Sequence, residues 1–258
     1  MGQHFLGDPA WRKRIFETLP RGADDLWIEI GAGHGEMTRL LAAPGRRVVA
    51  IEADARLARD LQQQVRAHPD AWPGVEVVVG DVLELDLAKL AGASFRVYGN
   101  LPYYITSPIL HRLFACADRI DSIHAVMQFE VAARIVARPG RRAYGYLSAA
   151  CQFYARPEIV LRIPPGAFRP PPRVTSALVC MTLPGERASL GLSQEGRFLE
   201  FVQLCFGQKR KTLRNNLRGT AADERIREAL AACALGLDAR AEQLSLAKFA
   251  ALFAGIGR

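Results

Sequence analysis

The segment Asn100-Leu101-Pro102-Tyr103 brings an amide, a rigid turn and an aromatic ring together directly after an apolar run. An amine on an aromatic base such as adenine is a poor nucleophile, because its lone pair is delocalised into the ring. Two acceptors for its protons, the Asn100 side-chain carbonyl and the Leu101 main-chain carbonyl, can draw that lone pair out of conjugation. Pro102 stiffens the turn without adding an amide proton, and Tyr103 offers a ring for stacking. The tetrapeptide therefore predicts a site that prepares an aromatic amine for attack, and the alternative is a proline turn with an incidental Asn cap.

A glycine-rich segment follows the first apolar run of the chain. Glu29 and Ile30 lead into Gly31-Ala32-Gly33-His34-Gly35, in which the glycines permit a sharp turn and close approach of a ligand to the backbone. A dinucleotide fingerprint requires its third glycine where this chain has Glu36. An acid at the start of the following helix would also oppose a pyrophosphate. The pattern instead resembles the first motif of S-adenosylmethionine-dependent methyltransferases.

Acidic residues end or follow the next two apolar runs. Glu52 can accept hydrogen bonds from both hydroxyls of an adenosine ribose. Asp81, which Val82 follows, can accept one from an adenine amino group. Either acid alone could be a helix N-cap. Together with the glycine segment and Asn100, they predict a nucleoside site.

Apolar runs of strand length alternate with amphipathic stretches in the first part of the chain. The expected strands are Leu26–Gly31, Arg47–Ala53, Val75–Asp81, Phe95–Leu101 and His124–Glu130. The expected helices between them are Glu36–Ala43, Arg56–Ala67, Leu83–Leu90 and Ile105–Ala117. This alternation predicts an open α/β sheet of the Rossmann-like methyltransferase type, which binds ligands beyond the carboxyl ends of its strands.

The pattern changes in the last third of the chain. Two further strands, Glu158–Ile163 and Ser176–Leu183, flank a proline-rich turn and are expected to pair antiparallel at the sheet edge. Helices alone follow, at about 194–206, 209–217, 221–233 and 245–253. We therefore expect a catalytic domain over 1–184 and a small helical domain over 185–258.

The basic residues are concentrated in two windows. The chain carries 34 Lys and Arg against 26 Asp and Glu, a net charge of +8. Residues 134–173 hold eight arginines and one acid, and residues 206–218 hold five bases and no acid. The rest of the chain is slightly acidic. This distribution favours a surface that contacts the phosphates of a nucleic acid over a generally basic protein, and a solvated charged surface is the alternative.

The five cysteines are widely spaced and form no C-x-x-C pair, which argues against a disulfide framework and against a zinc site. No run of eighteen apolar residues is present, and the first residues lack the apolar core of a signal peptide. We expect a cytoplasmic protein that binds no metal and no membrane.

Seven segments together resemble the KsgA/RsmA family of small-subunit ribosomal RNA adenine N6,N6-dimethyltransferases. They run from near the N-terminus into the predicted helical domain: Gly2–Leu6, Glu29–Gly35, Glu52, Gly80-Asp81, Asn100–Tyr103, Phe168–Val174 and Phe206–Leu213. The resemblance implies dimethylation of two adjacent adenines near the 3′ end of 16S rRNA, in the small (30S) subunit during ribosome biogenesis. It implies S-adenosylmethionine as the cofactor, and we expect a monomer.

The resemblance also implies roles for individual residues. His4 and Leu6 would close over the cofactor with Gln3 beside them. The cofactor contacts would come from Gly31, Gly33, Glu52, Asp81, Val82 and Asn100. Tyr103 and Phe168 would sandwich the adenine. The RNA phosphates would be held by Arg169, Arg173, Lys209, Arg210, Lys211 and Arg214.

Three positions depart from the family pattern. His4 stands where Asn is usual, Phe129 where Lys or Arg is common, and Tyr146 replaces a basic residue. The first puts a cofactor contact in question, and the other two put RNA affinity or substrate choice in question. Two alternatives remain: an Erm-like 23S rRNA adenine methyltransferase, against which Leu101 and Pro170–Pro172 argue, and a non-catalytic RNA-binding assembly or transcription factor.

Overall fold

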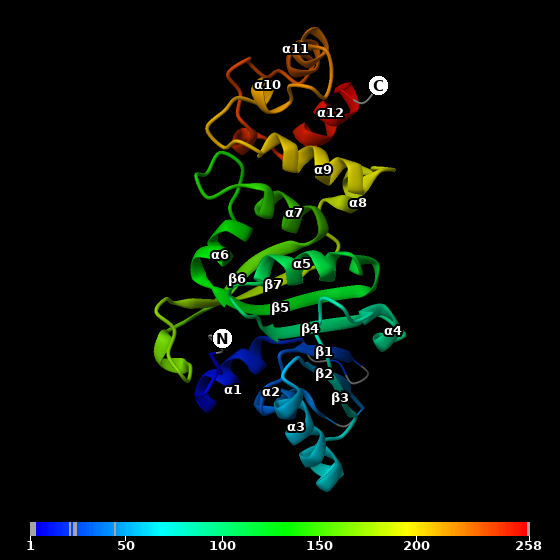
Figure 1. Cartoon of the computed structure of the whole chain (residues 1–258), viewed down its shortest axis with the longest axis vertical. Helices are drawn as coiled ribbons and strands as arrows, with labels where there is room; N and C mark the ends of the chain where they lie inside the picture. The colour runs from blue at the N-terminus through cyan, green and yellow to red at the C-terminus, as the bar shows by residue number, and fades with distance from the viewer. Residues whose placement is uncertain (1–3, 21, 23–24, 44, 257–258) are drawn as a thin grey trace. The chain divides into compact units, whose positions relative to one another are not determined.

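A computed structural model describes residues 4–20, 22, 25–43 and 45–256. The chain divides into two compact units, coloured along the sequence in Figure 1. The first unit contains the described residues up to Ala132 together with Pro157–Leu183. The second contains Ala133–Arg156 and the described residues from Pro184 onward.

The first unit is built on a seven-stranded sheet with the spatial order β3-β2-β1-β4-β5-β7-β6. The strands are β1 (Leu26–Ile30), β2 (Arg47–Glu52), β3 (Val75–Val79), β4 (Phe95–Asn100), β5 (Ile120–Gln128), β6 (Arg156–Ile163) and β7 (Ser176–Thr182). The first five are parallel, and β7 pairs antiparallel with β5. The predicted Rossmann-like sheet is confirmed, and β5 begins four residues before its predicted start because Ile120–Ile123 also pair with β4 and β7.

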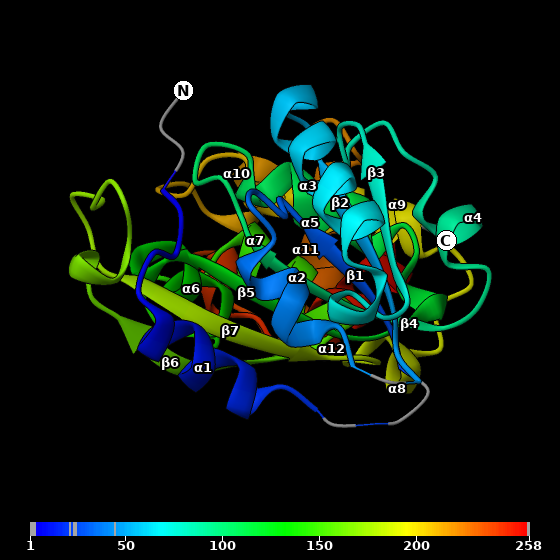
Figure 2. The ribbon, with the colours of Figure 1, turned by 90° about the horizontal axis from the view of Figure 1, so that it is seen from below.

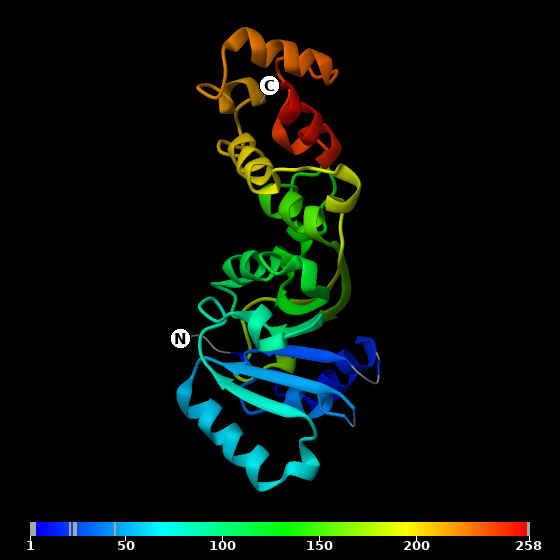
Figure 3. The same ribbon diagram turned by 90° about the vertical axis from the view of Figure 1, so that its right-hand side faces the viewer.

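Helices cover both faces of this sheet. They are α1 (Pro9–Thr18), α2 (Glu36–Leu41), α3 (Ala55–Ala67), α4 (Leu87–Ala91), α5 (Thr106–Phe114) and α6 (Phe129–Ile135), with 3₁₀ turns at Pro69–Ala71, Ala117–Arg119 and Pro165–Ala167. Figures 1 and 2 show α1 and α2 on one face and α5 on the other. Figure 3 shows α3 alongside β3 and β2, against which it packs. Neighbouring strand residues such as Trp27 and Ile28 are both fully buried because each face is covered.

The second unit is helical. Its helices are α7 (Tyr146–Tyr154), α8 (Arg187–Leu190), α9 (Glu195–Cys205), α10 (Leu213–Asn216), α11 (Asp223–Ala232) and α12 (Leu246–Ile256), with a 3₁₀ turn at Ala241–Gln243. Their core is rich in aromatic rings, and the ring centroids of Phe153 on α7 and Phe198 on α9 are 5.5 Å apart.

The chain crosses between the two units three times, whereas one boundary after residue 184 was expected. The segment 133–156 belongs with the C-terminal helices. The reason is the apolar face of α7, because Ala149 and Phe153 are buried in the same core as Phe198. The backbone of the segment 133–156 also contacts this unit, since the Gly140 amide donates to the Glu242 carbonyl at 2.7 Å.

The helix predicted over 209–217 is shorter than expected. Helix α10 begins only at Leu213, where the Thr212 hydroxyl caps the Asn215 amide. The preceding residues form turns, with Lys211 donating to the Gln208 carbonyl at 2.9 Å. Three consecutive basic side chains therefore stand on a loop before the helix.

Candidate functional site

A cavity of about 360 Å³ lies in the first unit at the carboxyl ends of the parallel strands. Most residues predicted to carry chemistry line it: His4, Gly31, Glu52, Asp81, Val82, Asn100, Leu101, Pro102 and Tyr103. The parallel register explains why they converge. Ile30 pairs with Ile51 and with Gly99, so the ends of β1, β2 and β4 lie side by side.

The glycine segment after β1 adopts left-handed backbone conformations that other residues rarely adopt. Gly31 has φ +75° and Gly35 has φ +84°. A Cβ at Gly35 would lie only 2.5 Å from Leu61 of α3. A Cβ at Gly31 would instead stand on the cavity wall, 3.8 Å from the Asn100 carbonyl oxygen. Gly35 is therefore required for packing, and Gly31 leaves room for a ligand.

Glu52 is held in place by two main-chain amides. Its Oε2 accepts from the Gly33 amide at 2.8 Å and its Oε1 from the Asp54 amide at 2.9 Å. The side chain is buried, at 4% exposure. Each carboxylate oxygen has a second acceptor position, so both can still accept from a diol. Gly33 does not itself line the cavity, and its predicted cofactor contact stays a prediction.

Asp81 follows β3 and is fixed by a local turn. Its Oδ1 accepts from the Leu83 amide at 2.9 Å, which leaves Oδ2 as an acceptor toward the cavity that Asp81 lines. It begins no helix, because α4 is capped by Asp86 instead. The helix-cap interpretation of Asp81 is therefore wrong.

The side-chain amide of Asn100 is oriented by the N-terminal segment. Its Nδ2 donates to the His4 main-chain carbonyl at 2.8 Å. The amide nitrogen is thereby engaged, and Oδ1 is the group left to accept a proton from a ligand. The next turn is equally constrained, because Leu101 donates to the Val126 carbonyl at 3.0 Å and the Pro102 carbonyl accepts from Thr106 Oγ1 at 3.1 Å. Within the described ranges, no donor contacts the Leu101 carbonyl.

Two rings stand side by side at the cavity wall. Tyr103 is fixed by a 2.6 Å hydrogen bond between its hydroxyl and Ser176 Oγ, and burial raises the pKa of its phenol. The His4 ring stacks against it, with centroids 5.8 Å apart and planes inclined by 30°. His4 Nδ1 donates to the Pro170 carbonyl at 2.8 Å, since a carbonyl can only accept. His4 therefore lines the wall with a ring where the family pattern has an amide.

Two aromatic residues that line the cavity, Phe5 and Tyr104, were missed by sequence reasoning. Tyr104 lines the cavity and is 75% exposed. A large exposed aromatic beside a cavity is unusual for a purely structural residue. Its place directly after Tyr103 was the available signal.

Besides Gly33, two described residues predicted for the site, Leu6 and Phe168, do not line the cavity. Gln3 is outside the described residues. Leu6 is buried in the core beneath α1 and α2, where its carbonyl accepts from Arg12 Nη1 at 2.7 Å, so it does not close over the cavity. Phe168 is fully buried in the same core and does not line the cavity. The cause is the hydrogen bonding of its loop, in which Arg169 and Phe5 exchange main-chain bonds at 2.8 and 3.0 Å. The sandwich of Tyr103 and Phe168 is therefore not formed in this structure.

The predicted RNA-contacting residues lie in different units, and they differ in how many of their side-chain N–H groups already have partners within the protein. Arg169 and Arg173 belong to the first unit and are exposed, and Arg169 Nη1 donates to the Gly166 and Phe168 carbonyls at 2.9 and 3.0 Å. In the second unit, Lys209, Arg210 and Lys211 are exposed. Lys209 Nζ donates to the Arg142 carbonyl at 2.7 Å, which joins the two basic windows within that unit.

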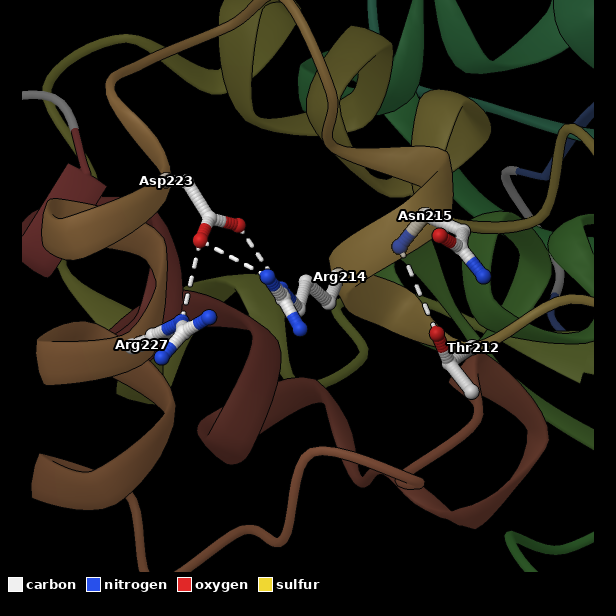
Figure 4. A network of polar contacts seen from close by, with 5 residues as sticks. All are labelled: Thr212, Arg214, Asn215, Asp223 and Arg227. Carbon is white, nitrogen blue, oxygen red and sulfur yellow. Dashed lines mark hydrogen bonds and ion pairs between the residues drawn. The ribbon is translucent and has the colours of Figure 1, made fainter.

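Arg214 is committed to an ion pair. Figure 4 shows its guanidinium bound by both oxygens of Asp223, at 2.7 and 2.8 Å, while Arg227 contacts the same carboxylate at 2.9 Å. These contacts raise the pKa of Arg214 and lower that of Asp223. The predicted phosphate contact of Arg214 thus competes with an internal partner.

The two departures on the expected RNA side have structural explanations. Tyr146 packs against the core of the second unit. Phe129 lies under the guanidinium of Arg162, 4.2 Å from the ring centroid, so a positive charge stands beside this position.

Beneath the glycine segment, Glu29 is completely buried on β1. Loss of solvation raises the pKa of its carboxyl to about 8, with smaller contributions from the nearby charges of Glu36 and Glu52. Burial also raises the pKa of the neighbouring Tyr98 phenol. The shift at Glu29 favours the protonated, uncharged form of its carboxyl at neutral pH.

Comparison with known sequences identifies the family. The family profile described as ribosomal RNA adenine dimethylase matches residues 1–256. The chain belongs to the ribosomal RNA adenine dimethylase family. It is 39% identical to ribosomal RNA small subunit methyltransferase A of Koribacter versatilis, over 98% of this chain and 92% of that protein. It is 41% identical to the protein of the same name from Acidobacterium capsulatum, over 98% and 89%.

Solved structures show the same dimethylase architecture. A dimethyladenosine transferase from Plasmodium falciparum superimposes with a TM-score of 0.79 at 21% identity, over 98% of both chains. The 23S rRNA methyltransferase ErmE superimposes with a TM-score of 0.74 at 27% identity, over 98% of this chain and all of that one. The predicted fold, family and enzyme class are confirmed, and the Erm-like and non-catalytic alternatives are not favoured.

The residues at the cavity fit S-adenosylmethionine, the cofactor of this dimethylase family. The open wall at Gly31 admits a ligand against the backbone, and Glu52 and Asp81 supply acceptors for hydroxyl and amino groups. Among the described residues, no group of three or more His, Cys, Asp or Glu could hold a metal ion. Within the same ranges, no helix has the length and apolar character needed to cross a membrane.

Proposed function

We propose that this enzyme transfers methyl groups from S-adenosylmethionine to the N6 amines of two adjacent adenines near the 3′ end of 16S rRNA in the small ribosomal subunit. The observation that carries the proposal is the orientation of Asn100. Its Nδ2 is bound by the His4 carbonyl, which leaves Oδ1 to accept an amine proton. The curated relatives of this chain carry the name small subunit methyltransferase.

The cofactor would be held by Gly31, Glu52, Asp81 and Val82. Gly31 gives access to the backbone, Glu52 accepts from the ribose hydroxyls and Asp81 from the adenine amino group. Bound S-adenosylmethionine supplies a methyl group already activated by its sulfonium sulfur. The protein must therefore supply alignment and acceptors, and the acceptors stand preorganised at the end of β4.

The target adenine must leave its stack to enter the cavity. Asn100 Oδ1 and the Leu101 carbonyl accept hydrogen bonds from the two N–H groups of the N6 amine. These bonds turn the nitrogen lone pair toward the methyl group. Tyr103 holds the base through stacking, worth about 1–3 kcal/mol. Pro102 keeps the two acceptors in a fixed relation. After methyl transfer, the positively charged N6 nitrogen loses a proton to solvent.

The remaining expectations follow from the substrate. We propose that Arg169, Arg173, Lys209, Arg210 and Lys211 contact RNA phosphates, with Arg214 contributing less because Asp223 binds it. A ribosomal substrate places the enzyme in the cytoplasm. We further propose that it acts as a monomer, without a metal ion, during assembly of the subunit.

The decisive experiment measures tritiated methyl transfer to immature 30S particles, to 50S particles and to free rRNA. We expect label on 30S particles, at two adjacent adenines. Label on 50S particles alone would select the Erm-like alternative. A protein that binds S-adenosylmethionine in calorimetry but labels no particle would contradict the proposal, and one that binds no cofactor would support the non-catalytic alternative.

A further inference from the structure

A chain of contacts along the sheet margin connects Tyr103 at the cavity wall with a second aromatic residue, Phe129. The Tyr103 hydroxyl contacts Ser176 Oγ at 2.6 Å, and Ser176 pairs with Gln128, the last residue of β5. Phe129 comes next in the chain, and its amide donates to the Thr175 carbonyl at 2.9 Å. Phe129 therefore stands beside the cavity on the same sheet margin, on the side away from the cofactor residues.

The guanidinium of Arg162 lies over this ring. Its Cζ is 4.2 Å from the centroid of Phe129, and the residue is exposed near the end of the edge strand β6. Stacking on an aromatic ring uses the face of a guanidinium and leaves its N–H groups pointing outward in the plane. Among the described residues, no carboxylate forms an ion pair with Arg162.

The nearest acid on its own strand does not cancel this charge. Glu158 lies four residues before Arg162 on the same exposed side of β6. At the rise of a β-strand the two are roughly 13 Å apart, which exceeds the screening length of about 8 Å at physiological ionic strength. Arg162 is thus a positioned, outward-facing cation beside the adenine cavity.

We propose that Arg162, held in place by Phe129, binds a backbone phosphate of the RNA next to the nucleotide whose base enters the cavity. A flipped base leaves its phosphates at the cavity mouth, and an arginine fork matches phosphate oxygens in a bidentate manner. Arg169 has fewer N–H groups available for such a contact, because its Nη1 is already bound to two carbonyls of its own loop. This inference rests on the proposed function, since it names a substrate contact of that site.

The test compares Arg162→Ala, Arg162→Lys and Phe129→Leu with the wild-type enzyme. Arg59→Ala is the matched control, because Arg59 is exposed on α3, which packs at the opposite sheet edge. The probe is an unmodified 16S rRNA 3′-end fragment, and its Kd is measured over a range of salt concentrations. Calorimetry with S-adenosylmethionine checks that the first unit, which contains the cavity, is folded in each variant.

We expect Arg162→Ala to weaken RNA binding about tenfold and to lower the salt slope by about 0.7 to 1, the loss of one phosphate contact. Arg162→Lys should keep the slope and lose part of the affinity, because it keeps the charge without the fork. Phe129→Leu should weaken binding several-fold at an unchanged slope. Cofactor affinity should stay constant in all variants.

An Arg162→Ala variant with wild-type RNA affinity and slope would overturn the inference, as would an equal loss in Arg59→Ala. Both results leave the proposed function intact if the wild-type enzyme still methylates 30S particles. Absence of methyl transfer by the wild type would instead remove the proposed function, whatever the binding data show.

Discussion

We call the residues proposed to hold the cofactor and the target amine the cofactor side, and those proposed to contact RNA phosphates the RNA side. The two groups are positioned differently. On the cofactor side, Glu52 is held by two main-chain amides and Asn100 by one main-chain carbonyl. On the RNA side, the proposed contacts are placed by side-chain partners: Arg214 binds Asp223 within the second unit, and Arg162 lies over Phe129 within the first. The cofactor side is therefore held mainly by main-chain groups, and the RNA side by side chains.

The largest effect is expected for Asn100→Ala. This change removes the Oδ1 acceptor and the bond to the His4 carbonyl, so methyl transfer should fall by about 10²–10³-fold. Cofactor binding should weaken only partly, because Glu52 and Asp81 remain. Tritiated methyl transfer and calorimetry measure the two quantities, with the exposed Asn215→Ala as the control. Wild-type turnover in Asn100→Ala would show that the Asn100 acceptor does not carry the chemistry.

A smaller effect is expected for Glu52→Gln. The change removes a charged acceptor, and such hydrogen bonds contribute about 1.5–3 kcal/mol. The affinity for S-adenosylmethionine should thus fall by about 10- to 100-fold. Glu76→Gln, at an exposed residue of β3 paired with Arg47, is the control for the change of charge. If both variants bound the cofactor equally well, Glu52 would have only a structural role.

The RNA side is tested by separating free cations from paired ones. Replacing Lys209, Arg210 and Lys211 together with Ala should weaken RNA binding about tenfold or more and lower the salt slope by about 2. Arg214→Ala should change the affinity by less than about twofold, because Asp223 already holds that guanidinium. Binding titrations over a range of salt concentrations distinguish the two. A larger effect of Arg214→Ala would mean that RNA displaces Asp223.

The smallest effect on catalysis at neutral pH is expected for Glu29→Gln. This change should instead alter the pH dependence of the free energy of unfolding. The unfolded chain loses the Glu29 proton near pH 4.5 and the native protein only near about 8. Between these values the native state holds an extra proton, so the unfolding free energy falls as pH rises. Glu29→Gln should remove this part of the slope. Urea unfolding from pH 5 to 8 measures it, and parallel curves for both proteins would show that Glu29 is ionised when buried.

The sequence was most informative where function lies at strand ends. The apolar runs predicted β1 to β5, and parallel pairing then brings Gly31, Glu52, Asp81 and Asn100 to one margin. Local motifs could not predict that Phe168 is buried, because this depends on hydrogen bonds between residues 5 and 169. They also could not place 133–156 with the C-terminal helices, since the partner of α7 lies about fifty residues further along the chain.

The hydrogen bond between Asn100 and residue 4 has an evolutionary consequence. The acceptor is the main-chain carbonyl of His4, which every amino acid provides. The side chain at this position can therefore change without reorienting the Asn100 amide, which is proposed to accept a hydrogen bond from the adenine amine. Natural variation at residue 4 can alter the shape and stacking of the cavity wall while the reaction geometry is inherited unchanged.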